Sequence, residues 1–196
     1  MTRRLTQRGQ DRRSQLMEFA GRRFAENGYH PTSVAEIVHG LGVGKGVFYW
    51  YFPSKEDLFL EILRESQHAL RRRQRQVIGN EPDPVKRIEV GIAATMQWLD
   101  ENRHLSRLFA FAATEERFAP ALRRGEEVAV GDLARHIKEG IVEGRIRDGD
   151  PLVLTYAVLG VVNNLARTFI FERGDPPQQV AEAAVAFCLD GLLGSS

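Results

Sequence analysis

The chain has 196 residues, of which 43% are apolar and 27% charged, and its 27 Lys and Arg almost balance its 26 Asp and Glu. This composition excludes a disordered chain and fits one globular domain or two small ones. A single cysteine excludes an internal disulfide. The longest uncharged run, Pro151 to Ala166, is shorter than the ~20 residues of a membrane helix, and the first 20 residues lack the apolar segment of a secretory signal. We therefore expect a cytoplasmic protein that does not enter a membrane.

The two parts of the chain differ in charge. Residues 1–80 carry 14 Lys and Arg against 8 Asp and Glu, whereas residues 81–196 carry 13 against 18. A basic N-terminal region followed by a mildly acidic C-terminal region is typical of a polyanion-binding module joined to a domain with a second function. A solvated mixed surface gives the same imbalance, so charge alone leaves both interpretations open.

The first predicted element is a helix that begins at Asp11. Its apolar residues recur at helical spacing until Asn27, where Gly28 ends the pattern. Residues 1–10 contain three arginines and little that can pack, and we expect them to form a disordered arm. The arginines of residues 1–23 serve either solubility or contact with a DNA backbone or minor groove.

Three more helices are predicted before residue 80. The second begins at Ser33, whose spacing to Glu36 matches a capping box. Gly42 supplies a sharp turn before the third helix, over residues 45–52, which Pro53 ends. Ser54 caps a fourth helix that extends to about residue 78.

The rest of the chain also has helical periodicity. Glycine, proline and asparagine separate its segments, and no stretch alternates as a strand does. The predicted fold is all-α with about nine helices, divided into a domain over 1–55 and a second domain over 56–196. The expected helices beyond the first break cover 84–101, 104–114, 119–143, 151–172 and 177–192.

No pattern of residues indicates an enzyme or a metal site. The glycines around Lys45 resemble a phosphate-binding loop, but His39 stands where that loop needs glycine and Gly46 where it needs Ser or Thr. The five histidines are scattered, and Cys188 has apolar neighbours that are typical of a buried core residue. We expect no catalytic residues, no metal and no cofactor.

The second and third helices with their glycine turn form a helix-turn-helix pattern, in which the second of the pair enters the major groove of DNA. Phe48 and Phe52 are four residues apart and should pack inward. Four adjacent aromatic residues cannot all point inward from one helix, which favours a nucleic-acid surface over a plain core. The residues predicted to face outward are Lys45, Gly46, Val47, Tyr49 and Trp50.

These side chains suit the chemistry of DNA. Lys45 can reach guanine or a phosphate, Gly46 allows close approach of the backbone, and Val47 can contact a thymine methyl group. The hydroxyls of Tyr49 and Tyr51, on either side of Trp50, can donate to phosphates. Lys55 adds charge at a helix start, where free N–H groups favour a phosphate.

The segment from Thr32 to Leu58 resembles the signature of the TetR (tetracycline-repressor-like) family of bacterial transcription regulators. The match departs at Val38, where the family has a small Ala, and at Gly44, where a Ser or Thr caps the recognition helix. Gly44 therefore inherits no side-chain role. The residues that carry the resemblance are Phe19, Phe24, Gly28, Tyr29, Thr32, Ile37, Gly42, Val43, Tyr49, Trp50, Tyr51, Phe52, Lys55 and Leu58.

The resemblance implies a DNA-binding domain followed by a ligand-binding and dimerisation domain. The predicted DNA contacts are Thr32, Ser33, Lys45, Gly46, Val47, Tyr49, Trp50, Tyr51 and Lys55. A ligand pocket, if present, is expected among Trp98, Phe109, Phe111, Tyr156, Asn163, Arg167 and Phe169, although plain core packing explains each of these residues equally well. The small-residue face of the last helix predicts a dimer interface at Val180, Ala184, Phe187, Cys188 and Gly191.

The sequence thus predicts a homodimeric transcription regulator, a repressor that a small-molecule effector releases from double-stranded DNA with an inverted-repeat operator. The alternative is a ligand-sensing protein of the same fold that does not bind an operator. The basic and aromatic residues of the third helix favour the first interpretation, because a chain without DNA binding need not retain them.

Overall fold

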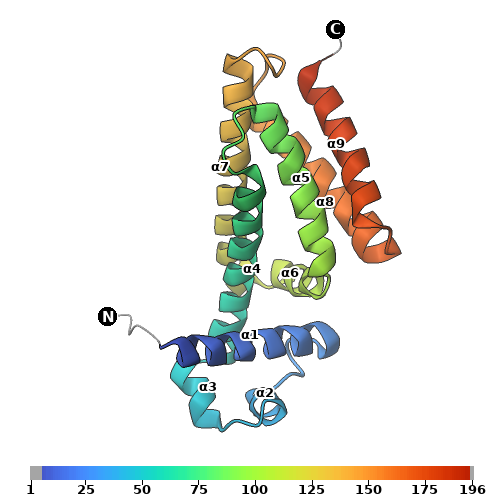
Figure 1. The fold of residues 1–196 in the computed structure, drawn as a ribbon. Coiled ribbons are helices and arrows are strands. Elements are labelled where there is room, and N and C mark those ends of the chain that lie inside the picture. Colours follow the sequence, from blue (N-terminus) through green and yellow to red (C-terminus); the bar gives the residue numbers. More distant parts are fainter. Residues whose placement is uncertain (1–5, 195–196) are drawn as a thin grey trace. The chain divides into compact units, whose positions relative to one another are not determined.

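The computed structural model describes residues 6–194, and within this range the chain is all-α, with no strand (Figure 1). The predicted fold class is confirmed. A 3₁₀ turn, η1 (Glu116–Phe118), and a π-helical segment, η2 (Ala166–Arg173), accompany the α-helices. The α-helices are α1 (Gln7–Asn27), α2 (Val34–Gly40), α3 (Lys45–Tyr51), α4 (Lys55–Ile78), α5 (Pro84–Glu101), α6 (His104–Thr114), α7 (Ala119–Val142), α8 (Pro151–Leu165) and α9 (Pro177–Leu193).

The chain forms two compact units, each built from two stretches of sequence. We call residues 1–66 with 104–122 the N-terminal unit, and residues 67–103 with 123–196 the C-terminal unit. Helix α4 belongs to both units along its length. The predicted boundary after residue 55 between a DNA-binding and a ligand-binding domain stays a prediction. The two compact units are divided differently, because α6 packs on α1 and so belongs to the N-terminal unit.

Helix α1 begins four residues before its predicted start. The Thr6 Oγ1 accepts a hydrogen bond from the Gly9 backbone N–H at 3.3 Å and caps the first turn. The expectation of a disordered arm is therefore wrong for residues 7–10, while Arg3 and Arg4 lie outside the described residues. The predicted apolar stripe of this helix is confirmed, since Leu16, Ala20 and Phe24 are buried.

An aromatic cluster forms the core of the N-terminal unit where α6 packs on α1. Phe59 of α4 is fully buried, and its ring centroid lies 4.9 Å from that of Tyr29 and 4.7 Å from that of Phe118. Phe111 of α6 stacks on Tyr29 at 5.2 Å. The Arg107 guanidinium of α6 donates to the Ala25 carbonyl at 3.1 Å, near the end of α1, where carbonyls lack helical partners.

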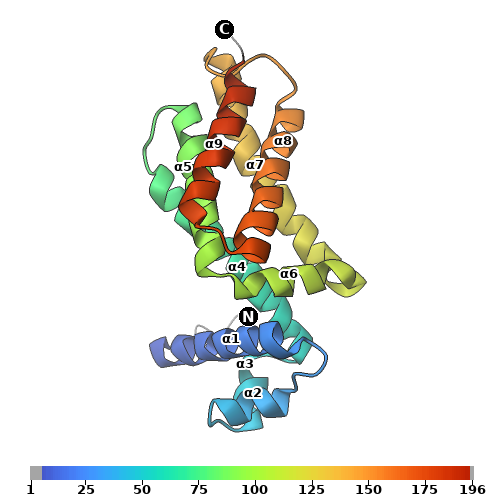
Figure 2. The ribbon, with the colours of Figure 1, turned by 90° about the vertical axis from the view of Figure 1, so that its right-hand side faces the viewer.

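The C-terminal unit is built around the contact of α9 with α5 and α8, which lie side by side (Figures 1 and 2). Its core includes Met96 and Ile170, both completely buried. The stretch Pro151–Arg173 is long and apolar enough to cross a membrane by length and composition, a criterion that core helices of soluble proteins also meet. Only a third of its apolar window is buried within the chain, so α8 presents apolar side chains at the surface.

Candidate nucleic-acid interface

The turn between α2 and α3 has the geometry that its sequence predicts. Ser33 caps α2, because its Oγ accepts a hydrogen bond from the Glu36 N–H at 3.1 Å. Gly42 adopts a φ of +64°, a left-handed conformation that favours glycine. The Val43 N–H then bonds to the Val38 carbonyl at 2.9 Å, which closes the turn and directs the chain into α3.

Helix α3 has one buried face and one exposed face. Phe48 and Phe52 are 0% and 3% exposed, which confirms that they pack inward. Tyr49 and Trp50 are 54% and 55% exposed. Large aromatic side chains with this much exposure on a seven-residue helix need another reason than core packing.

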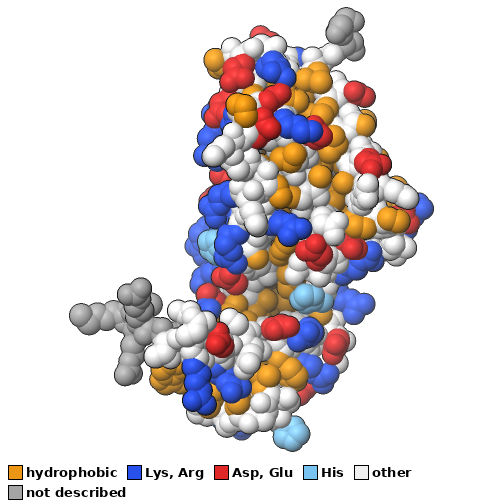
Figure 3. All heavy atoms as spheres, viewed as in Figure 1, with side chains coloured by type: hydrophobic (Ala, Val, Ile, Leu, Met, Phe, Trp, Pro, Cys, Tyr) orange, Lys and Arg blue, Asp and Glu red, His pale blue; other side chains and the backbone are white. Residues whose placement is uncertain are grey.

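The amino end of α3 is open to an approaching ligand. Lys45, Gly46 and Val47 are all exposed, and no atom lies within 4 Å of the position that a Cβ of Gly46 would take. Gly44 caps this helix without a side-chain hydrogen bond, as its lack of a side chain requires. The surface over α1–α3 shows basic and hydrophobic side chains together (Figure 3).

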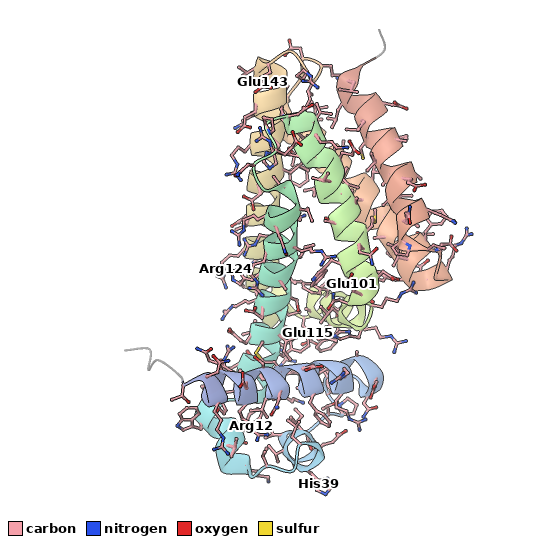
Figure 4. All side chains as sticks on the ribbon, viewed as in Figure 1. Arg12, His39, Glu101, Glu115, Arg124 and Glu143 are labelled. Carbon is pink, nitrogen blue, oxygen red and sulfur yellow. The ribbon has the colours of Figure 1, made fainter. Side chains whose placement is uncertain are left out.

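Tyr51 and Ser33 complete the set of predicted contacts that reach the surface. Tyr51 is half-buried, and its ring meets that of Trp50 edge to face at 4.4 Å. Ser33 is exposed although its hydroxyl caps α2. The neighbouring His39 is also exposed and projects from α2 away from α1 (Figure 4).

Two of the predicted DNA contacts, Thr32 and Lys55, are engaged inside the protein. The Thr32 side chain is completely buried, and its hydroxyl donates to the Gly28 carbonyl at 2.8 Å. The Lys55 ammonium donates to the carbonyls of Tyr29 at 2.8 Å and Thr32 at 2.9 Å and lies 4.4 Å from the Tyr29 ring centroid. Burial, and then the nearby Arg117 charge, lower the pKa of Lys55. Both residues thus hold the connection between α1 and α2.

Two arginines of α1 pair with acidic residues of other helices. The Arg23 guanidinium donates to Glu36 of α2 through Nε at 2.9 Å and through Nη2. This bond from Arg23 is the main reason why the pKa of Glu36 is lowered. Arg13 makes an ion pair with Glu61 of α4 at 2.6 Å. From the sequence we expect these arginines to serve solubility or DNA contact. The pattern does not predict the ion pairs, because Glu36 lies 13 residues from Arg23 and Glu61 lies 48 residues from Arg13.

The seven residues predicted to line a ligand pocket are divided between the two units. Phe109 and Phe111 belong to the N-terminal unit, where Phe111 lies in the aromatic cluster. The other five belong to the C-terminal unit, with Trp98 and Phe169 half-buried and Tyr156, Asn163 and Arg167 exposed. Arg167 pairs with Glu172 at 2.7 Å. The pocket stays a prediction, with Tyr156, Asn163 and Arg167 on a face of α8 that points outward rather than into the core.

Three of the five residues predicted for a dimer interface are buried within the chain, and the interface stays a prediction. Val180, Ala184 and Cys188 are 7%, 0% and 4% exposed, because the small-residue face of α9 packs inside the C-terminal unit. Burial raises the pKa of the Cys188 thiol, as fits the predicted core residue. Phe187 is 67% exposed and Gly191 is exposed, so only these two of the five residues can meet a partner. Within residues 6–194, no group of three His, Cys, Asp or Glu is placed to hold a metal ion.

The chain is similar to known regulatory proteins. Residues 16–62 match the model of bacterial regulatory proteins of the tetR family. The HTH-type transcriptional regulator YdgC of Bacillus subtilis is 26% identical in an alignment 196 positions long that covers 95% of each chain. The HTH-type transcriptional repressor KstR2 of Mycobacterium tuberculosis is 26% identical over 194 residues, which cover 92% of both. A solved transcriptional regulator from Saccharomonospora viridis, in complex with choline, superposes with a TM-score of 0.80 at 20% identity over 95% of this chain and 100% of that one.

Proposed function

Because this chain belongs to the TetR family of bacterial transcriptional regulators, we propose that α3 is the helix that it inserts into the major groove of DNA. The chain is a DNA-binding regulator, and its family consists of regulators rather than enzymes. The observation that carries the assignment to α3 is the exposure of Tyr49 and Trp50 opposite the buried Phe48.

Each exposed group of α3 has a role in this proposal. Lys45 reaches a phosphate or a guanine at the amino end of the helix, and Val47 meets a thymine methyl group. Gly46 lets the backbone approach the groove, and the tyrosine hydroxyls donate to phosphates. Ser33 contacts the backbone from the start of α2. Thr32 and Lys55 support this surface through the connection that they hold, and a phosphate contact of Lys55 is a separate prediction.

A second copy of the chain is the proposed partner of α8 and α9. Leu152, Val153, Tyr156 and Phe187 are each at least half exposed, which is a large apolar surface for one chain to leave in water. A two-fold dimer buries the same face of both copies and presents two α3 helices. Such a dimer binds an inverted repeat with half-sites in successive major grooves. We place the protein in the cytoplasm, where its DNA is.

We propose that the regulator is a repressor which a small molecule releases from DNA. The similarity to a repressor and to a regulator solved with choline supports this, while the chemistry of the effector stays open. Helix α4 runs through both units and is the proposed lever. Release requires the effector to bind the DNA-free form more tightly, and a coupling of ~1–3 kcal/mol changes affinity about 5- to 150-fold.

The test is a selection from a random duplex library, followed by salt titrations on the selected sequence. We expect an inverted repeat and a slope of log K against log salt of about −7 to −9, from roughly 0.9 for each of eight to ten phosphates. Val47→Ala should change sequence preference, whereas Val142→Ala on the exposed end of α7 is the matched control and should not. Equal affinity for every duplex would refute operator recognition and favour a ligand sensor that does not bind an operator.

A further inference from the structure

One arginine of α1 joins three helical elements at the carboxyl end of α3. The Arg13 Nη2 donates to the Glu61 carboxylate of α4 at 2.6 Å. Its guanidinium carbon lies 5.4 Å from the centroid of the Phe52 ring, within cation–π range. Its Nη1 also lies 3.4 Å from the Met17 sulfur on the same helix.

Phe52 is the buried residue at the carboxyl end of α3. It caps the helix, and its N–H bonds to the Phe48 carbonyl at 2.9 Å. Its side chain is 3% exposed, so the ring has little freedom to move. The amino end of α3 has no side-chain cap, and a seven-residue helix is not stable by itself. The burial of Phe48 and Phe52 therefore stabilises α3 in its place.

We propose that Arg13 is a positioning residue for DNA binding: it holds the Phe52 end of α3 against α1 and α4, and it does not contact DNA itself. This inference rests on the proposed role of α3. The Arg13 and Glu61 side chains are 29% and 31% exposed and form an ion pair, and Glu61 also pairs with Arg64 at 3.7 Å. By contrast, Arg22 of the same helix is 57% exposed and pairs with Glu18 one turn away. Arg13 is therefore half-buried and held by contacts within the protein on the side where α3 ends.

The consequence for DNA binding follows from geometry. Contacts with base edges depend on distances of about 3 Å, so a small tilt of α3 weakens all of them at once. Loss of Arg13 should therefore lower affinity for the operator more than affinity for unrelated duplexes, while the number of phosphates neutralised stays the same. A residue that touches a phosphate behaves differently, because its loss makes the salt slope less negative by about 0.9 in each half-site.

The experiment compares Arg13→Met, Arg13→Lys and Glu61→Gln with Arg22→Met as the matched control. On the selected operator, we expect Arg13→Met to lower affinity about tenfold with an unchanged salt slope. Arg13→Lys keeps the cation and should restore most of the affinity. Adding Glu61→Gln to Arg13→Met should cost less than Glu61→Gln costs in the wild type, because the bond between Arg13 and Glu61 is already lost and only the pair of Glu61 with Arg64 at 3.7 Å remains to be removed. Arg22→Met should leave α3 in place, and any effect that it has on affinity should appear as a less negative salt slope, because the arginines of residues 1–23 are also candidates for phosphate contact.

Amide hydrogen exchange over residues 45–52 gives a second readout that needs no DNA. Exchange should be faster in Arg13→Met and Glu61→Gln but unchanged in Arg22→Met. A salt slope that becomes less negative by about 1.8 in Arg13→Met would mean a phosphate contact and overturn the proposal. Unchanged affinity with a lower melting temperature would reduce Arg13 to a stabilising residue, and unchanged exchange would also refute the proposal. If the wild type binds no selected duplex, the proposed function fails, whereas the exchange data still decide whether Arg13 positions α3.

Discussion

Two glycines of α7 should respond in opposite ways to the same substitution. A Cβ built on Gly140 would lie 2.5 Å from the Ile146 Cδ1 and 2.7 Å from its Cγ1. The chain folds back here, since the Arg145 and Ile146 N–H groups both bond to the Gly140 carbonyl, at 2.8 and 3.0 Å. No atom lies within 4 Å of the corresponding position on Gly131, in the middle of the same helix.

The expected magnitudes follow from these distances. Carbon atoms in contact are about 3.5–4.0 Å apart, so Gly140→Ala requires Ile146 to move by about 1 Å. Ile146 is 3% exposed, and overpacking of a core costs roughly 1–3 kcal/mol. Alanine is better than glycine within a helix by about 1 kcal/mol, which favours both variants. Gly131→Ala should therefore be more stable than the wild type by up to ~1 kcal/mol and more stable than Gly140→Ala by ~1–3 kcal/mol.

Urea unfolding followed by circular dichroism measures this difference directly. The two variants and the wild type are compared at one protein concentration, because association shifts apparent stability. The free energies of unfolding come from the midpoints and a shared slope. The reasoning is refuted if Gly140→Ala is as stable as Gly131→Ala, since Ile146 would then yield without cost.

Further predictions concern the aromatic cluster, the α1–α2 ion pair and the surface of α9. Phe59→Ala should lower the free energy of unfolding by ~3–5 kcal/mol in a urea titration, because the fully buried ring leaves a cavity among aromatic neighbours, and a loss below ~1 kcal/mol would contradict this packing. The lowered pKa of Glu36 means that its ion pair with Arg23 stabilises the fold above the unfolded pKa near ~4.3 and that this contribution is lost as the pH falls through the lower folded value. The melting temperature of the wild type should therefore exceed that of Glu36→Gln at pH 7, and the gap should close in acid; a gap independent of pH would exclude this origin. Phe187→Glu should convert the proposed dimer into a 22.1 kDa monomer in sedimentation experiments while circular dichroism shows unchanged helicity, and a wild type that already sediments as a monomer would refute the proposed dimer.

The sequence by itself determined the local features of this protein. Helix ends depend on caps and turn residues within a few positions, so Ser33, Gly42 and Pro53 located α2 and α3. The inward and outward faces of α3 also follow from the helical period, which places Phe48 and Phe52 on one side. The structure differs at the start of α1, because the Thr6 cap lies in a basic stretch without apolar residues that would indicate a helix. It also divides the helix predicted over 151–172 into α8 and the π-helical η2.

Which residues pack against each helix face depends on the tertiary structure. An apolar face must be buried, but its pattern does not say whether another helix of the same chain or a second copy covers it. Helix α9 therefore packs Val180, Ala184 and Cys188 into its own unit and leaves Phe187 outside. The partners of Arg13 and Phe111 are similarly distant in sequence, at Glu61 and Tyr29, and only the packing of α1 with α4 and α6 brings them together. The positions of the helices thus follow from local sequence, whereas the neighbours of each helix follow from the close packing of apolar faces in one core.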